Sequence, residues 1–260
     1  MSTPVTAIML TCDRPQMTAR AVKSFEAQTY KNKRLVIFDT STGTITRYRG
    51  HFQHCEIGSW RGRTIGALRN AANQYADVGS LIAHFDSDDI SHPRRLEEQV
   101  TLLEASGKAC VGYRELLFWD TRSQLASDFS LNLPAVSCGF PRDEAWLYRG
   151  QDPRWVCGAS MLYTRQSWEA CPFDDAPGED RIWWLKNAEK CVGISAIDPT
   201  RLENFQAGDS IVDDGQPRMV CGIHGANTEA YSRADMLSGG GGVWQRAPEF
   251  DSYCERTMRL

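Results

Sequence analysis

Short apolar runs alternate with amphipathic stretches along the first hundred residues. Each apolar run ends in a polar cluster, as buried parallel strands do at the edge of a sheet; the runs are Val5–Thr11, Arg34–Phe38 and Ser80–Phe85. The clusters contain Asp13-Arg14-Pro15, Asp39-Thr40-Ser41 and Asp86-Ser87-Asp88-Asp89. Because open α/β sheets bind ligands beyond the carboxyl ends of their strands, these clusters are the first candidates for a functional site.

Amphipathic helices are predicted between these strands. Proline at position 15, shortly after an aspartate, is a helix-start signal, and the apolar residues Met17, Ala21, Val22 and Phe25 then share one helical face. The same spacing predicts a helix over Thr64–Tyr75 and another from Pro93 to Gly107. The order of strand, loop, helix and strand is typical of an open α/β sheet.

The pattern is weaker in the second half of the chain. Strands are expected at Ala109–Tyr113, Leu116–Trp119, Val156–Thr164 and Val192–Ile197, the last of these being the final strand expected. A helix is expected to begin at Gly178-Glu179-Asp180 and to carry Trp183 and Trp184. Residues 44–63 are expected to be irregular, and the run Gly239–Gly242 indicates a flexible hinge.

Composition narrows the class of protein. The 260 residues are 42% hydrophobic and 24% charged, which predicts one globular α/β unit and excludes a disordered chain. The net charge of −4 argues against sequence-independent attraction to nucleic acid or anionic lipid. No apolar run approaches the length of a membrane span, and the first residues lack a signal-peptide pattern, so we expect a cytoplasmic protein whose nine cysteines are reduced.

The Asp86-Ser87-Asp88-Asp89 cluster is the strongest chemical signal. Three carboxylates within four residues repel one another unless a cation neutralises them, and Asp86 and Asp88 can reach one hard divalent ion from a turn. A solvated acidic turn before Pro93 is the alternative. An EF-hand is excluded because its sixth position is Ser91 instead of glycine, and an aspartyl phosphatase is disfavoured by Ile90 and by the third-strand location.

Two later motifs are further candidates. Glu179 and Asp180 at a helix start either complement the helix dipole or supply a general base beside a cleft. His224 lies between glycines, which permit close backbone approach, and is either structural or a ligand. The phosphate-binding loop, the dinucleotide-binding glycine fingerprint and the nucleophile elbow of α/β-hydrolases are all missing from the sequence.

In their order, these motifs resemble those of family 2 glycosyltransferases over about residues 4–230. The shared elements are a first strand ending in TCDRP, a second ending in Asp39, a helix carrying Arg69-Asn70, the DSDD cluster, a helix starting with GED, and the late histidine. The sequence departs from the family at DTST, where DDGS is usual, and at LRN, where ARN is usual. The resemblance implies a GT-A type fold, with a Rossmann-like mixed sheet flanked by helices in a single domain.

The resemblance also implies a division of the chain and a donor site. Residues 1–107 would form the nucleotide-sugar-binding lobe, residues 108–230 the acceptor-binding and catalytic lobe, and residues 231–260 a flexible C-terminal lid or tail. A UDP-sugar would be bound by residues of the first lobe, namely Thr11, Asp13, Arg14, Asp39, Arg69, Asp86 and Ser87. Asp88 and His224 would hold Mn²⁺, or Mg²⁺, at the diphosphate.

The implied reaction is an inverting hexosyl transfer to an acceptor hydroxyl. The metal would stabilise the leaving diphosphate, and Asp180 would be the general base, with Glu179 as second candidate or as a residue that orients the acceptor. The expected acceptor is a bacterial surface glycan or another glycoconjugate; a small molecule or a protein stays open. The abundance of arginine over lysine also leaves open a modified base in phage-like DNA, and a non-catalytic nucleotide-sugar-binding module is the other alternative.

Overall fold

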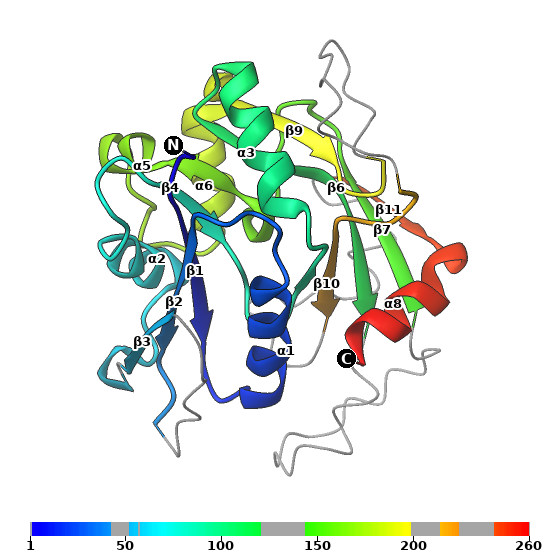
Figure 1. Ribbon diagram of the computed structural model, residues 1–260, viewed down its shortest axis with the longest axis horizontal. Coiled ribbons are helices and arrows are strands. Elements are labelled where there is room, and N and C mark those ends of the chain that lie inside the picture. The colour runs from blue at the N-terminus through cyan, green and yellow to red at the C-terminus, as the bar shows by residue number, and fades with distance from the viewer. Residues whose placement is uncertain are drawn as a thin grey trace.

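A β-sheet with helices on both faces forms the frame of the protein (Figure 1). The computed structural model describes residues 2–42, 52–56, 58–120, 144–198, 214–223 and 242–259. Its strands are β1 (Val5–Thr11), β2 (Lys33–Asp39), β3 (Phe52–Glu56), β4 (Leu81–His84), β5 (Ile90–Ser91), β6 (Cys110–Asp120), β7 (Glu144–Gly150), β8 (Leu162–Thr164), β9 (Cys191–Ser195), β10 (Met219–Ile223) and β11 (Gly242–Arg246).

The helices and the short 3-10 turns fill the connections between strands. The helices are α1 (Pro15–Glu26), α2 (Ile65–Asn73), α3 (Arg95–Ser106), α5 (Arg165–Ala170), α6 (Glu179–Asn187) and α8 (Asp251–Met258). The turns are η1 (Gly58–Trp60), η2 (Gly158–Ser160), η3 (Ala188–Lys190) and η4 (Pro248–Phe250). Among the described helices, none combines the length and the apolar composition needed to cross a membrane.

The sheet is mixed, with a parallel part and an antiparallel part. The main path runs β11-β7-β6-β8-β4-β1-β2-β3, while β10 pairs with β5 and β6, and β9 pairs with β6. β1 is parallel to both β2 and β4, so the polar residues that follow these strands lie at one edge of the sheet. This arrangement confirms the predicted mixed α/β fold of GT-A type.

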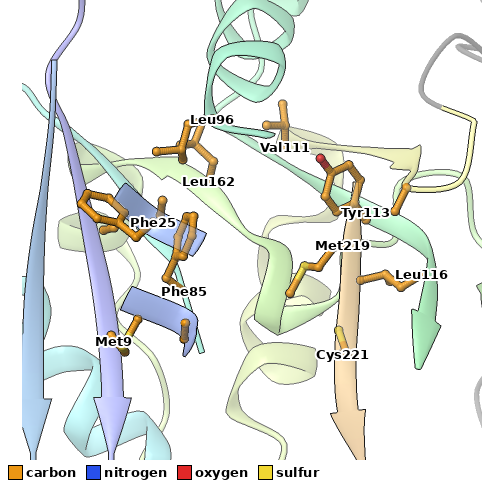
Figure 2. Packing of buried hydrophobic residues seen from close by; sticks show 14 of the residues in the cluster. Met9, Phe25, Phe85, Leu96, Val111, Tyr113, Leu116, Leu162, Met219 and Cys221 are labelled. Carbon is orange, nitrogen blue, oxygen red and sulfur yellow. The ribbon is translucent and has the colours of Figure 1, made fainter. Parts of the chain in front are cut away.

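Side chains alternate in direction along the central strands, so buried residues lie on both faces of the sheet. Met9 of β1 packs with Phe25 of α1 and Leu96 of α3 on one face, as Figure 2 shows. Ile8 points the other way and packs with residues of α2 and α6, including Leu68 and Trp183. Because successive strand side chains face opposite sides, the continuous apolar run of β1 can be buried on both faces.

The predicted helices from position 15, over 64–75, from Pro93 and from Gly178 are confirmed as α1, α2, α3 and α6. The two strands expected between Ala109 and Trp119 are one strand, β6, because Glu115 in the polar gap continues the ladder opposite Arg149 of β7. The strand expected over Val156–Thr164 is wrong for its first half. There the hydroxyl and amide of Ser160 both donate to the Cys157 carbonyl, which makes the turn η2 before the short strand β8.

The chain continues beyond Val192–Ile197, which was expected to be the last strand. β10 and β11 follow it, and β11 pairs with β7. α8 packs Cys254 and Met258 against β6, β7 and β10, so residues 242–259, which we expected within a lid or tail, form a strand and a helix of the fold. Gly239–Gly241 lie outside the described residues, and the division into lobes stays a prediction.

The core assignment can be tested with two matched leucines. Leu96→Ala should lower the free energy of unfolding by about 2–5 kcal/mol, because Leu96 is fully buried and its truncation leaves a cavity. Leu185 is 61% exposed on α6, so Leu185→Ala should change that free energy by no more than about 0.5 kcal/mol. Urea unfolding followed by circular dichroism measures both. Equal losses in the two variants would contradict this placement of Leu96.

Candidate functional site

The loops after β1 and β2 are tied to each other at the sheet edge. Asp13 has a left-handed backbone with φ of 52°, and its amide donates to the Ser41 hydroxyl at 2.7 Å. The Ser41 amide in turn donates to the Asp39 carboxylate at 2.9 Å. The Thr11 hydroxyl is 2.7 Å from that of Thr18 in α1, and the side chain is buried. Thr11 and Asp39 are therefore buried supports of these loops, while Asp13 is exposed beside them.

Of the three aspartates of the DSDD loop, one is buried in the interior and two are partly exposed at the site. The Asp89 amide donates to the Asp86 carbonyl at 3.3 Å, which closes a turn, and the Asp89 side chain is buried. Its carboxylate accepts a hydrogen bond from the Gly222 amide of β10 at 3.0 Å. Asp86 and Asp88 keep partial exposure, whereas the buried Ser87 hydroxyl has no hydrogen-bond partner among the described residues. Asp86 and Asp88 are thus the carboxylates that a ligand can reach.

Burial and mutual repulsion make the carboxyl groups of Asp86 and Asp89 hard to ionise. Burial raises the pKa of Asp86, with a further contribution from Asp88 that Arg69 opposes. Burial, Asp88 and Asp86 raise the pKa of Asp89 well above its ordinary value. A nearby cation relieves such repulsion, so the loop is electrostatically suited to bind one.

One arginine contacts this loop, and a second bonds to residues just before and just after it. Arg14 donates to the Asp88 carboxylate at 2.9 Å. Arg95 is fully buried beneath the loop, where it donates to the His84 carbonyl at 2.8 Å and to the Ser91 hydroxyl at 2.9 Å. We did not predict Arg95, because a cation in the first turn of a helix opposes the helix dipole and is expected to face solvent. The place of an arginine in the first turn of a helix is the only signal in the sequence for the burial of Arg95.

Arg69 on α2 joins the DSDD loop to the start of α6. Its Nε donates to Glu179 at 3.0 Å, and its Nη1 lies 3.5 Å from an Asp86 oxygen. The Arg69 residue is only 6% exposed. Burial alone would lower the pKa of Arg69, but Asp86, Glu179 and Asp180 outweigh it and raise that pKa. Arg69 therefore stays charged between carboxylates from two separate parts of the chain.

Asn70, which follows Arg69, holds the chain segment that leads into α6. Its Nδ2 donates to the Phe173 carbonyl at 2.7 Å, and its Oδ1 accepts from the Phe173 amide at 3.0 Å and from the Trp168 indole at 2.9 Å. We did not predict a role for Asn70. Asparagine is disfavoured inside helices, and such a position is a usable signal of a specific side-chain contact.

The start of α6 presents two acids in different surroundings. Gly178 caps the helix with a left-handed φ of 70°, as glycine readily does. Glu179 is buried, and burial together with Asp180 raises its pKa against the opposing effect of Arg69. Asp180 is partly exposed, and its Oδ1 accepts a hydrogen bond from the Arg181 amide at 2.7 Å. The structure thus brings Arg69, Asp86, Glu179 and Asp180 together.

The described part of the site matches a metal ion only in part. Carboxylate oxygens of Asp86 and Asp88 are the donors that a hard divalent cation prefers. Within the described ranges, however, no three His, Cys, Asp or Glu side chains are grouped so that they could hold a metal ion. His224 lies outside the described residues, which end here at Ile223 of β10. The loop could therefore hold an ion with one or two carboxylates if other groups complete the ligand set.

The ionisation of Asp89 gives a testable pH dependence. Its raised pKa means that the folded protein holds a proton that the unfolded chain has lost, so stability falls as pH rises above the unfolded pKa of about 4. Asp89→Asn removes this titration and keeps an oxygen for the Gly222 amide. The free energy of unfolding of Asp89→Asn minus that of the wild type should grow between pH 4 and 8, by at most about 1.4 kcal/mol per pH unit.

Denaturant unfolding in EDTA at several pH values measures this difference. EDTA prevents a divalent ion from offsetting the loop's charge. A difference that stays constant across the range would show that Asp89 ionises as readily in the folded protein as in the unfolded chain.

Solved structures with a similar fold include those of TarS from S. aureus. The structure of TarS 1–349 in complex with UDP-GlcNAc gives a TM-score of 0.57 at 12% identity, covering 88% of this chain and 62% of that one. The structure titled TarS gives 0.56 at 12% identity over 85% of this chain and 37% of that one. At this identity the likeness shows the shared fold.

Sequence comparisons give one relative and one family. A stretch of 100 residues is 34% identical to the Bacillus subtilis (strain 168) protein named "Putative glycosyltransferase EpsE", covering 36% of this chain. The match spans 35% of EpsE, so this chain accounts for only about a third of that relative. The family model described as Glycosyl transferase family 2 matches residues 6–146, which is more than half of the chain. The chain belongs to glycosyl transferase family 2.

Proposed function

We propose that this protein transfers a hexosyl group from a UDP-sugar to an acceptor hydroxyl. The observation that carries the proposal is the convergence of Asp86 and Asp88, at the strand edge, with the acids of α6 through Arg69. A cation-binding loop for a diphosphate and a carboxylate for proton transfer are the two parts that such a reaction needs. Complexes of TarS with UDP and with UDP-GlcNAc support UDP as the nucleotide.

The loops after β1 and β2 are proposed to bind the nucleoside. Asp13 offers an exposed carboxylate for base and ribose donors, and Asp39 offers a buried one that also accepts the Ser41 amide, with Thr11 supporting the loop. Thr40 stands where the family usually has a second acid, and its amide and hydroxyl both donate to the Thr11 carbonyl, at 3.0 and 3.3 Å. In the DTST sequence a threonine therefore replaces one acid and links the two loops by hydrogen bonds. Asp39 is left as the carboxylate that accepts hydrogen bonds from the nucleoside.

The diphosphate is proposed to lie beside Arg14, Asp88 and Ser87. Asp88, together with His224, would hold Mn²⁺ or Mg²⁺, which when bound supplies positive charge for the leaving diphosphate. Arg14 lies on Asp88 in this structure and can donate to phosphate oxygens from the same position. Asp86 is paired with Arg69, so we assign it to orienting the loop and the ribose.

Asp180 is proposed as the general base. Glu179 is buried, and one of its oxygens accepts the Arg69 Nε, whereas Asp180 is partly exposed. The acceptor oxygen would attack the anomeric carbon and give its proton to Asp180, while the bond to the diphosphate breaks with its electron pair on the leaving oxygen. A single displacement of this kind inverts the anomeric configuration, so an α-linked donor gives a β-linked product.

For the acceptor we propose a surface glycan or another glycoconjugate, as the family resemblance implies. A hydroxyl on a modified DNA base is the alternative, and strongly salt-dependent binding of duplex DNA would favour it, because phosphate contacts release counterions. A non-catalytic sugar-nucleotide-binding module would bind UDP without ever releasing it from a donor.

Donor hydrolysis tests the proposed activity. Purified protein with one UDP-sugar from a panel of UDP-, GDP- and TDP-sugars should release UDP with Mn²⁺ or Mg²⁺ and lose this release in EDTA. Asp88→Ala should lower the rate by about 10²-fold or more, because the leaving group loses its charge stabilisation. Asp77→Ala is the matched control, since the Asp77 side chain is 65% exposed and remote from the loop. UDP binding without release from any donor would favour the binding module.

The two acids of α6 provide a second test. Asp180→Asn should lower kcat by about 10²–10⁴-fold at unchanged fold, because proton removal from the acceptor is lost. Glu179→Gln keeps an oxygen for the Arg69 Nε and should lower kcat by less than about tenfold. Steady-state transfer rates with one donor and acceptor pair measure both variants. A larger loss in Glu179→Gln than in Asp180→Asn would reverse the assignment of the base.

A further inference from the structure

His84 is a fully buried histidine directly behind the proposed catalytic acids. It is the last residue of β4, two positions before Asp86, and is 0% exposed. Its main-chain amide donates to the Met161 carbonyl at 2.9 Å. Its ring contacts two groups, with Nδ1 2.6 Å from the Gly158 carbonyl and Nε2 3.0 Å from the Tyr163 hydroxyl. The proposed reaction assigns no role to this ring.

The partners of His84 fix the direction of each hydrogen bond. A carbonyl oxygen only accepts, so Nδ1 must carry the proton and donate to Gly158. In the neutral ring Nε2 is then the acceptor, and Tyr163 donates to it. The Tyr163 hydroxyl accepts in turn from the Asn73 amide of α2 at 2.9 Å. A chain of donors thus runs from α2 through Tyr163 and His84 to the Gly158 carbonyl.

Gly158 lies directly against the proposed general base. A Cβ atom at this position would lie 2.1 Å from Oδ2 of Asp180 and 2.7 Å from its Cβ, so only glycine leaves room for the carboxylate. The rest of the turn is anchored separately. Ser160 donates to the Cys157 carbonyl at 2.8 Å, and Gln99 donates to the Ser160 carbonyl at 2.8 Å. Among the described residues, His84 is the side chain that holds the Gly158 carbonyl, which also accepts a longer hydrogen bond from the Met161 amide at 3.4 Å.

We propose that His84 is a positioning residue that sets the place of the Asp180 carboxylate through the Gly158 backbone. The inference rests on the role of Asp180 in the proposed function. If the Gly158 peptide rotates, the backbone that lies against the Asp180 carboxylate moves with it. A displacement of about 1 Å in a reacting group can cost roughly 10²-fold in rate without loss of substrate binding. The effect of His84 should therefore fall on kcat and leave the donor KM unchanged.

Two substitutions of His84 separate its two hydrogen bonds. His84→Asn places an amide nitrogen near the position of Nδ1 and can keep the bond to Gly158. His84→Gln reaches the position of Nε2 and can keep only the contact with Tyr163. His84→Gln should lower kcat by about 10–100-fold with donor KM within twofold, and His84→Asn should restore kcat to within about threefold of the wild type.

Tyr163→Phe is the matched structural control. It removes a hydroxyl from the same buried chain but leaves the bond between His84 and Gly158 in place. It should lower the melting temperature and leave kcat within about twofold. Equal losses of kcat in His84→Asn and His84→Gln, or a loss in Tyr163→Phe as large as in His84→Gln, would overturn the inference, because general loosening of the core would then explain both.

Two further measurements do not depend on the folding of the His84 variants. NMR of ¹⁵N-histidine-labelled protein should show His84 neutral with its proton on Nδ1, and a proton on Nε2 alone would overturn the inference. Gly158→Ala should lower kcat at unchanged UDP affinity, because its methyl group displaces Asp180. Wild-type kcat in this variant would also overturn the inference.

Asp180→Asn, assayed in parallel, separates this inference from the proposed function. If Asp180→Asn is inactive and His84→Gln has wild-type kcat, the role of His84 is wrong and the base assignment stands. If Asp180→Asn keeps wild-type kcat, the base assignment is wrong, and the role of His84 fails with it. The inference holds if Asp180→Asn and His84→Gln both lose kcat and His84→Asn does not.

Discussion

The site depends on one buried guanidinium. Arg69 lies between Asp86, which follows a central strand, and Glu179, which begins a helix 110 residues after Arg69. Burying two carboxylates without a cation would cost several kcal/mol for each. The planar guanidinium can face both at once, which a lysine ammonium does less well. The distance between the DSDD loop and the start of α6, the two parts of the proposed site, therefore depends on this side chain of α2.

The same loop is fixed from its other side by close backbone packing. Asp89 turns inward and accepts the Gly222 amide, and a Cβ at Gly222 would lie 2.7 Å from the Asp88 carbonyl. β10 can approach the loop this closely because position 222 is glycine. The DSDD sequence therefore has two functions. Its first and third residues are partly exposed and are the carboxylates proposed to face the ligand, while its fourth is buried and ties the loop to β10.

Local patterns predicted those parts of the fold whose signals are local. The apolar run of β1 and the amphipathic face of α1 need only their own residues to be recognised, and both were predicted with nearly correct bounds. β11 and α8 were missed because their burial depends on β7 and β10, which lie far away in sequence. In the site, the acids of α6 and the DSDD loop were found by motif. The pairing of Arg69 with Glu179 follows from tertiary packing and has no local signature, and the burial of Arg95 is signalled only by its place in the first turn of α3.

Two adjacent acids on one helix can take different roles only if their surroundings differ. Glu179 is held by Arg69 in the interior, and Asp180 is left with one oxygen on a backbone amide and the other against Gly158. Enzymes assign acid and base roles to paired carboxyl groups by such differences in environment. No ion pair with a described residue fixes the position of Asp180, so the backbone behind it must supply that restraint. In our proposal this backbone is the turn whose Gly158 carbonyl accepts a hydrogen bond from His84.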